Sequence, residues 1–338
     1  MTGPTAVVAV GGNALLRGGP AATIAEQFDA ARMIATSVAD MVRSGWRVVV
    51  THGNGPQVGF IKRRSDLAAE MAPELPSLDL DMCVADSQGS LGYILASTLA
   101  GELRAAGLPD RVLAVVTHTV VDGADQAFEE PTKPIGSFYT REQAQRLAAA
   151  HGWTVAEDSG RGWRRLVPSP QPRSIVEQGA VGALVDDGFL VVAAGGGGIP
   201  VVEQPDGRYR GVEAVIDKDF ASALLAHGLG ADTLVVTTSV PQIALDFGTP
   251  DERPVTHMDA SEARRHLVDG QFPEGSMGPK VRAALAFLEG GGDEVLVTSP
   301  EVLTEAWAGR TGTRFVARAR NSGVLLARDA SVRPLCEP

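Results

Sequence analysis

The feature that most limits the fold of this chain is a regular alternation of short β-branched runs with longer Ala-rich stretches. The interiors of the runs are apolar without every-second-residue alternation, as is typical of parallel strands covered on both faces. Alternation of this kind predicts an α/β fold with a largely parallel open sheet and helices on both sides. The predicted strands are Thr5–Val10, Arg47–Thr51, Val112–Thr117, Phe189–Ala194, Thr233–Thr238, Glu294–Thr298 and Arg314–Ala317, and the predicted helices are Thr23–Ser44, Ser87–Ala106, Thr140–His151, Ser174–Asp186, Lys218–Gly228, Ala260–Asp269 and Gly278–Glu289.

A segment from about residue 121 to residue 172 interrupts the alternation. It is rich in proline, contains two tryptophans and has no long apolar run. Loops this long without structure of their own are uncommon in compact domains unless they serve a function. We therefore expect a protruding lid subdomain at 121–172 within an N-terminal lobe of residues 1–190, followed by a C-terminal lobe of residues 191–338. An ordinary long surface loop is the alternative.

The overall composition excludes several classes of protein. Apolar residues make up 44% of the 338 residues, which is too much for a disordered chain. The net charge of −11 disfavours nucleic-acid binding, because a phosphate backbone needs a basic face. The longest apolar stretch, Phe189–Val202, is broken by glycines and too short to cross a bilayer. With no signal-peptide pattern at the start and only two cysteines, Cys83 and Cys336, we expect a cytoplasmic protein without a disulfide framework or a four-thiolate zinc site.

Glycine-rich turns follow three of the predicted strands, at Gly11–Ala14, His52–Gln57 and Gly195–Pro200. Ligands of open parallel sheets bind outside the carboxyl ends of the strands. Glycines let backbone N–H groups approach an anion there, and a following helix N-terminus adds a favourable dipole. Three such turns predict a site for a phosphate-type anion. The usual signatures GxxxxGK[ST], GxGxxG after the first strand, GxSxG and HExxH are absent.

Lysine is the rarest charged residue of the chain, with four lysines among the 30 basic residues. A retained lysine therefore marks a position where a compact charge on a flexible stem is needed. Lys218 and Lys280 open predicted helices, and Lys133 lies between prolines in the lid segment. Phosphoryl transfer needs positive charge around the moving group, and Asp217 is placed to orient these lysines, to share a magnesium ion with phosphates or to cap the following helix. Lys62, in a Lys-Arg-Arg run, is interpreted as an ordinary solvated charge without a role.

The motifs taken together resemble those of carbamate kinases, a branch of the amino-acid-kinase superfamily. The similarity extends from about residue 6 to residue 313. The stretches that carry it are GGNALL (Gly11–Leu16), VVVTHGNGPQVG (Val48–Gly59), SQGSLGY (Ser87–Tyr93), EEPTKPIGSFY (Glu129–Tyr139), GWRRLVPSP (Gly162–Pro170), AAGGGGIPVV (Ala193–Val202), GVEAVIDKDFASALLA (Gly211–Ala226) and GSMGPKV (Gly275–Val281).

This resemblance implies a three-layer αβα sandwich with a protruding lid, a homodimer, and reversible phosphoryl transfer between ADP and carbamoyl phosphate with ATP and Mg²⁺. It also implies a place in arginine metabolism. By the family pattern, the transferred phosphoryl group would be held by Gly11, Gly12 and Asn13, and the carbamate end by Gly53 and Asn54.

The remaining roles also follow from the resemblance. Lys133 would close on the site from the lid, in place of the lysine that most of the superfamily carries before the first glycine pair. Lys218 and Lys280 would span the nucleotide phosphates, organised by Asp217. Backbone groups would meet the nucleotide along the tetraglycine turn and elsewhere, at Gly195, Gly196, Gly197, Gly198, Thr237 and Met277. No protein residue is assigned as a metal ligand.

Three departures from the family pattern and several functions stay open at this point. Gln126, Ser90 and the stretch Thr237–Pro241 differ from most members, and the last of these leaves the nucleotide preference open. Besides a carbamate kinase, the sequence allows a kinase of the same architecture for another small carboxylate or carbamate-like acid. A non-catalytic ligand-binding regulator on the same scaffold and a nicotinamide-dependent dehydrogenase are weaker alternatives, because the three motif lysines are retained and no dinucleotide fingerprint is present.

Overall fold

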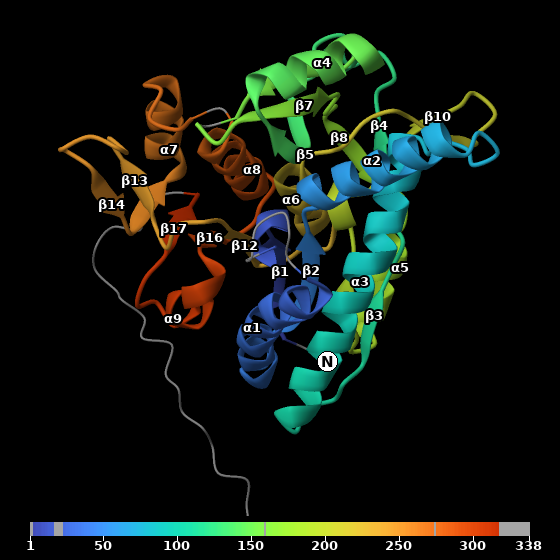
Figure 1. Cartoon of the computed structure of the whole chain (residues 1–338). Helices are drawn as coiled ribbons and strands as arrows, with labels where there is room; N and C mark the ends of the chain where they lie inside the picture. Colours follow the sequence, from blue (N-terminus) through green and yellow to red (C-terminus); the bar gives the residue numbers. More distant parts are fainter. Residues whose placement is uncertain (1–2, 17–22, 159, 274, 318–338) are drawn as a thin grey trace, which may run out of the picture.

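A computed structural model of the chain describes residues 3–16, 23–158, 160–273 and 275–317 (Figure 1). Residues 318–338 of the expected C-terminal lobe, with Cys336, lie outside the described residues. The centre is an eight-stranded sheet. Six neighbouring strands are parallel to one another, and the two strands at one edge run in the opposite direction. In spatial order the strands are β15 (His257–Asp259), β17 (Thr313–Val316), β16 (Glu294–Thr298), β12 (Thr233–Thr237), β1 (Thr5–Val10), β2 (Arg47–His52), β9 (Leu190–Val192) and β3 (Val112–Ala114).

Helices cover both faces of this sheet, because its central strands are buried on both sides. Along β1, Val7 belongs to one apolar core and its neighbours Ala6 and Val8 to the other. The prediction of a three-layer α/β fold is thereby confirmed. One face carries α1 (Ile24–Arg43), α3 (Leu80–Ala105) and α9 (Leu303–Trp307), and the other carries α5 (Gln178–Asp186), α6 (Lys218–Gly228), α7 (Ala260–Val268) and α8 (Met277–Glu289).

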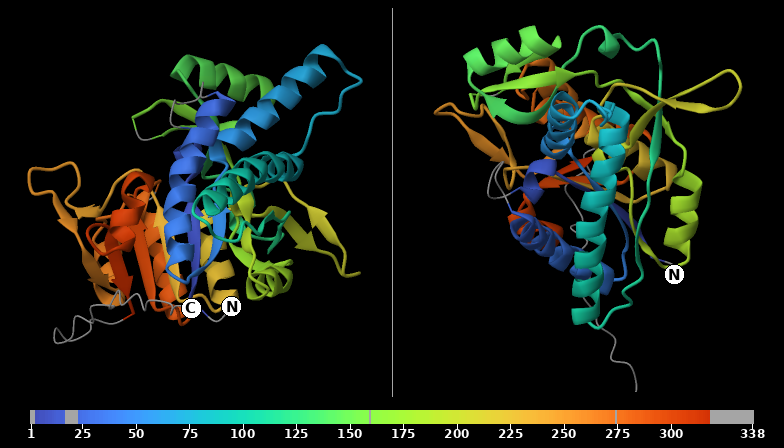
Figure 2. Two further views of the ribbon diagram at one scale, coloured as in Figure 1. Left: turned by 90° about the horizontal axis from the view of Figure 1, so that it is seen from below. Right: turned by 45° about the vertical axis from the view of Figure 1, so that its right-hand side comes forward.

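Two further sheets extend from the carboxyl ends of the central strands. The first has the order β11 (Tyr209–Gly211), β10 (Ile199–Glu203), β4 (His118–Val121) and β8 (Pro172–Ile175). The second is the lid, which consists of β5 (Lys133–Tyr139), β7 (Trp163–Val167), β6 (Thr154–Glu157) and the helix α4 (Arg141–His151). In both views of Figure 2 the lid lies beside α2 (Gly55–Met71). The remaining elements are the hairpin β13 (Ile243–Leu245) and β14 (Arg253–Val255) and the short 3-10 turns η1 (Gly12–Leu15), η3 (Gln126–Phe128), η4 (Gly195–Gly197) and η5 (Pro300–Val302).

Several element boundaries differ from the sequence prediction. Helix α2 was not predicted, because its buried residues, Gln57 and Val58, lie at its start and the rest of the helix is partly exposed. The predicted helix Ser174–Asp186 is wrong over its first residues, which belong to strand β8. The predicted strand Val112–Thr117 is cut to Val112–Ala114, since the chain there leaves the central sheet for the four-stranded sheet that contains β4.

No helix in the described part of the chain combines the length and apolar character that crossing a membrane requires. The division into two lobes at residue 190 stays a prediction. Hydrogen bonds join β9 to β2 and β3, and β10 to β4. The strands on both sides of the expected boundary are therefore joined to strands of the N-terminal half.

Candidate active site

The turns after β1 and β2 lie against each other at the carboxyl edge of the central sheet. The Gly53 N–H donates to the Val10 carbonyl, with N···O 2.8 Å. A methyl group on Gly12 would lie 3.0 Å from the Gly53 carbonyl carbon, and one on Gly53 would lie 2.9 Å from the Gly12 nitrogen. Glycine is therefore needed at both positions for this backbone-to-backbone contact. Asn13, which follows Gly12, is exposed in η1.

Buried amide side chains support this pair of turns. Asn54 holds the N-cap position of α2, but its side chain does not bond to the helix; its Nδ2 donates to the Ser87 hydroxyl at 2.8 Å. Gln57, one turn later, donates through Nε2 to the Gly12 carbonyl at 3.2 Å. Its Oε1 is buried without a hydrogen-bond partner. Our sequence analysis assigned no role to Gln57, although its place three residues after Asn54 on a helix is a usable signal.

The tetraglycine turn after β9 is packed from all sides. A methyl group on Gly195 would lie 2.4 Å from Nε2 of His52, and one on Gly196 would lie 2.2 Å from Nδ2 of Asn54. The N–H groups of Gly197 and Gly198 donate within the turn, to the carbonyls of Ala194 and Gly195. These two donors are therefore used inside the turn. Nucleotide contact of Gly195, Gly196, Gly197 and Gly198 stays a prediction.

Lysines from two helices meet on one buried carboxylate. Lys218 and Lys280 both donate to Asp219, with Lys280 Nζ 3.1 Å from Oδ2. The Asp219 side chain is only 3% exposed. Lys218 passes directly over the Gly53 turn, since a methyl group on Gly53 would lie 3.0 Å from its Cδ. Our prediction that Asp217 organises this lysine pair needs correction, because Asp219 holds both ammonium groups. The second acid of the Asp-Lys-Asp sequence was the signal for it.

Asp217 instead pairs with the lid lysine. Its Oδ2 lies 2.5 Å from Lys133 Nζ, and its Oδ1 accepts from the Asp219 N–H at 2.8 Å and so caps α6. The helix cap that the sequence suggested is present. Lys133, Asp217, Asp219, Lys218 and Lys280 therefore form one cluster, with three ammonium groups against two carboxylates. We call it the lysine cluster.

Burial and neighbouring charges shift the pKa values in this cluster. Burial opposes ionisation of Asp219, but Lys218 and Lys280 outweigh it, so its pKa lies far below the usual range. Burial also opposes ionisation of Asp217, and the attraction of Lys133 lowers its pKa below normal. Burial lowers the pKa of Lys218 despite Asp219, whereas for Lys280 the attraction of Asp219 and then Asp217 outweighs burial and raises the pKa. Both carboxylates are therefore ionised at neutral pH.

The predicted nucleotide contacts Thr237 and Met277 lie at the end of β12 and at the start of α8. Thr237 is buried, accepts from the Gly11 N–H at 3.1 Å and donates to the Ala9 carbonyl at 3.2 Å. Its hydroxyl thus joins β12 to β1. Met277 is the first residue of α8, three residues before Lys280. Contact of either residue with a nucleotide stays a prediction.

Lys62 is not the solvated charge that the sequence suggested. Its side chain is 14% exposed and donates to Asp66 Oδ1 at 2.8 Å and to the Ser77 hydroxyl at 3.0 Å. The surface interpretation was wrong because α2 lies under the lid, and the sequence did not predict α2. Lys62 stays outside the lysine cluster.

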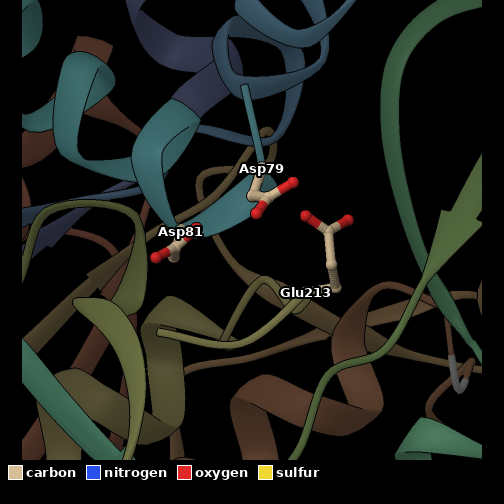
Figure 3. Close-up of side chains that lie close together, drawn as sticks. All are labelled: Asp79, Asp81 and Glu213. Carbon is tan, nitrogen blue, oxygen red and sulfur yellow. The ribbon is translucent and has the colours of Figure 1, made fainter. Parts of the chain in front are cut away.

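A cluster of three acidic side chains lies away from the lysine cluster in the described part of the chain. Carboxylate oxygens of Asp79, Asp81 and Glu213 lie within 4.8 Å of one another at the start of α3 (Figure 3). Glu213 accepts from the Leu80 N–H at 2.6 Å. A carboxylate at a helix N-terminus is stabilised by the unpaired N–H groups and the helix dipole, so a structural role accounts for this group.

The glycine turns, the lysine cluster and every strand of the central sheet except β17 fall inside the part of the chain matched by a family model. The model described as amino acid kinase family matches residues 4–299. The chain belongs to the amino acid kinase family. Among this kinase's relatives, the carbamate kinase of Thermococcus kodakarensis is 45% identical over 311 residues, which cover 92% of this chain and 98% of that protein.

Solved structures of related kinases agree with this assignment. A carbamate kinase from Giardia lamblia bound to citric acid has a TM-score of 0.87 and 40% identity, covering 93% of this chain and 99% of that one. The carbamate kinase from Giardia lamblia bound to AMP-PNP has a TM-score of 0.83 at 40% identity, with the same coverage. Because both structures cover 93% of this chain, the likeness extends over nearly the whole fold of this kinase.

Proposed function

We propose that this kinase is a carbamate kinase, which transfers a phosphoryl group reversibly between carbamoyl phosphate with ADP and carbamate with ATP. The observation that carries the proposal is the lysine cluster beside the Gly12 and Gly53 turns. Three of the four lysines of the chain meet there, from three separate segments. The similarity to named carbamate kinases over nearly the whole chain supports the same activity.

The residues of the cluster suggest a division of labour. The transferred phosphoryl group carries its charge on peripheral oxygens, so catalysis depends on positioning and positive charge more than on covalent chemistry. Lys218 lies over the Gly53 turn and next to Lys280, where the two ammonium groups would face the phosphates. Lys133 would stabilise the transferred group from the lid. In this scheme the backbone of Gly11–Asn13 holds that group, and Gly53 and Asn54 hold the carbamate.

We propose that Mg²⁺ enters this site with the nucleotide. Magnesium prefers oxygen ligands and is usually held by one or two carboxylates together with substrate phosphates and water. Both carboxylates of the lysine cluster are bound to ammonium groups, so the fit is to a metal held chiefly by phosphates. Asp217 is the more accessible of the two, since its side chain is 20% exposed and that of Asp219 is 3% exposed. When bound, the ion supplies neutralisation of phosphate charge. Excess chelator should therefore abolish turnover, and full activity without free divalent metal contradicts this arrangement.

The nucleotide would lie on the side of α6 and α8, beyond β12. Lys280 and Met277 belong to the first turn of α8, whose N-terminal N–H groups favour an anion. A nucleotide analogue is bound in one of the related structures, the AMP-PNP complex from Giardia lamblia. Cellular ADP and ATP would supply this site in the cytoplasm, with carbamoyl phosphate from arginine metabolism.

A coupled assay tests the proposal directly. Purified protein is given Mg·ADP with either carbamoyl phosphate or acetyl phosphate, and ATP formation is followed. We expect ATP from carbamoyl phosphate and little from acetyl phosphate. Faster turnover of another acyl phosphate would instead favour the alternative of a kinase for a different small carboxylate, and no ATP from either would point to a binding protein.

Replacement of Lys133 tests the site within the same assay. Lys133→Ala should lower kcat by a factor on the order of 10²–10³, as loss of one preorganised charge does in other active sites, with a smaller effect on KM for ADP. Lys133→Arg should also be poor, because the guanidinium is planar and larger than an ammonium. A Lys133→Ala enzyme with normal kcat would remove the lid lysine from the mechanism.

We also propose a homodimer. Exposed apolar side chains lie on α3, at Met82 and Tyr93, and in or just after the edge strand β3, at Leu113 and Val116. A second copy of the chain would cover them. Light scattering should then give twice the 35.2 kDa chain mass, and a strictly monomeric active enzyme would contradict the dimer.

A further inference from the structure

The lid rests on α2 through a contact between two backbones. A methyl group built on Gly59 of α2 would lie 2.2 Å from the Gly136 Cα and 2.3 Å from the Gly136 nitrogen in β5. Both are main-chain atoms, which cannot turn aside as a flexible side chain does. Gly136 itself has φ +73°, a conformation that favours glycine.

Helix α2 reaches both the substrate turns and the lid. Its first turn holds Asn54 and Gln57, and Gln57 is hydrogen-bonded to Gly12. Gly55 lies on the face that meets β5, where a methyl group would be 3.7 Å from the Pro134 carbonyl oxygen. Gly59 follows four residues later, about one helical turn further along the same face. The same helix therefore sets the distance between the glycine turns and the lid strand.

Lys133 depends on this contact, because it is the first residue of β5 and Gly136 lies three residues further on. Between them Ile135 is buried and packs in one core with Val58 of α2. No flexible linker separates the contact from the lysine. A shift of β5 away from α2 moves the backbone that carries the Lys133 ammonium.

We propose that Gly59 is a positioning residue, which keeps Lys133 in place by letting the lid backbone lie directly on α2. The inference rests on the proposed role of Lys133. Non-bonded carbon atoms rest about 3.5–4.0 Å apart, so in Gly59→Ala the strand must retreat by more than about 1 Å. Misplacement of a catalytic group by about 1 Å costs up to about 10²-fold in rate.

A double-mutant cycle tests the proposal. ATP formation from carbamoyl phosphate and Mg·ADP is measured for wild type, Gly59→Ala, Lys133→Ala and the double variant. We expect Gly59→Ala to lower kcat about 10- to 100-fold with KM for ADP little changed. Because Gly59 acts through Lys133, the same substitution should change kcat less than about twofold in the Lys133→Ala background.

Gly101→Ala is the matched control, because Gly101 also lies inside a helix and a methyl group there would meet nothing within 4 Å. It should leave kcat unchanged. Equal losses from Gly59→Ala with and without Lys133, or normal kcat in folded Gly59→Ala, would overturn the proposal. If Lys133→Ala itself is fully active, the proposed function of the lid lysine fails instead.

Thermal melts show whether Gly59→Ala folds, and a second variant takes its place if it does not. Ile135→Val removes one methylene from the neighbouring apolar contact of β5 with Val58 of α2, a change that cores usually tolerate. It should lower kcat several-fold in the wild-type background and not in Lys133→Ala. An identical effect in both backgrounds, or none in either, would also overturn the role of this contact.

Discussion

At the scale of single residues, the chain keeps lysine where arginine would not fit. The Lys218 and Lys280 ammonium groups share one carboxylate that is 3% exposed. A compact ammonium suits such a crowded position better than a planar guanidinium. Asp219 is the centre of this arrangement, because burial would otherwise leave two positive charges without compensation.

Replacing Asp219 should be costly for both stability and turnover. In Asp219→Asn, two buried ammonium groups lose their counter-charge, and breaking a buried pair typically costs about 3–5 kcal/mol. We expect the urea midpoint to fall sharply and kcat to drop on the order of 10²-fold. Asp206→Asn is the control, since Asp206 pairs with Arg208 on the surface at 3.6 Å, where such pairs contribute about 0–1 kcal/mol. Equal midpoints for the two variants would refute the central role of Asp219.

Lys62→Ala separates a structural lysine from the catalytic ones. Loss of the partly buried hydrogen bonds from Lys62 to Asp66 and Ser77 should lower the free energy of unfolding by about 1–2 kcal/mol. Turnover should stay close to normal, because Lys62 lies outside the lysine cluster. Urea unfolding and steady-state kinetics measure the two effects. A loss of kcat as large as that of Lys133→Ala would show that Lys62 also takes part in catalysis.

At the scale of elements, the turns that leave the central strands contain several positions where glycine is required. Gly197 has φ +89°, and a methyl group there would lie 2.6 Å from the Ile216 carbonyl oxygen. The turn thereby lets β9 lead into β10 while the chain before α6 lies directly on it. Conformation and close packing both demand glycine at this position.

Two alanine substitutions separate these demands. Gly207, between β10 and β11, has φ +79° with nothing within 4 Å of a built methyl group, so Gly207→Ala should cost about 1 kcal/mol of backbone strain. Gly197→Ala adds overpacking and should cost about 2–4 kcal/mol. Denaturant unfolding compares them. If both variants lose the same stability, close packing at Gly197 contributes nothing.

At the scale of the whole molecule, stability should depend on pH through a buried histidine. His52 ends β2 against Gly195, and burial lowers its pKa from 6.5 to about 4. The folded protein therefore keeps His52 neutral below pH 6.5, where the unfolded chain takes up a proton. Stability should fall as the pH drops from about 6.5 to about 4, by about 2 kcal/mol at pH 5.

The carboxylates of the lysine cluster affect stability at a lower pH than His52 does. The pKa values of Asp217 and Asp219 are depressed, so their contribution is present above the ordinary carboxyl range and is lost only at more acid pH. Unfolding in urea at pH 7 and pH 5 isolates the histidine. His52→Gln should remove most of the difference between these two values. An unchanged difference in His52→Gln would place the acid sensitivity elsewhere.

The local sequence pattern predicted those features that depend on neighbours in the chain. The apolar run Thr5–Val10 forms β1 with the predicted bounds, since a strand buried on both faces needs apolar side chains throughout. The helix that opens at Lys218 and the capping role of Asp217 also follow from a few adjacent residues. The lysines were marked as functional candidates by their rarity and their place at glycine-rich turns and helix starts.

Other features needed the tertiary structure, because they join residues far apart in sequence. No local pattern shows that Lys280 and Lys218 share Asp219, or that Lys133 reaches Asp217 across 84 positions. Helix α2 lacks a strong apolar stripe and is buried only where the Gly12 turn, α3 and the lid cover it, which also explains the error at Lys62. Charge pairing and burial at these positions are decided by which surfaces meet in the fold, whereas strand and helix formation is decided by the residues along each segment.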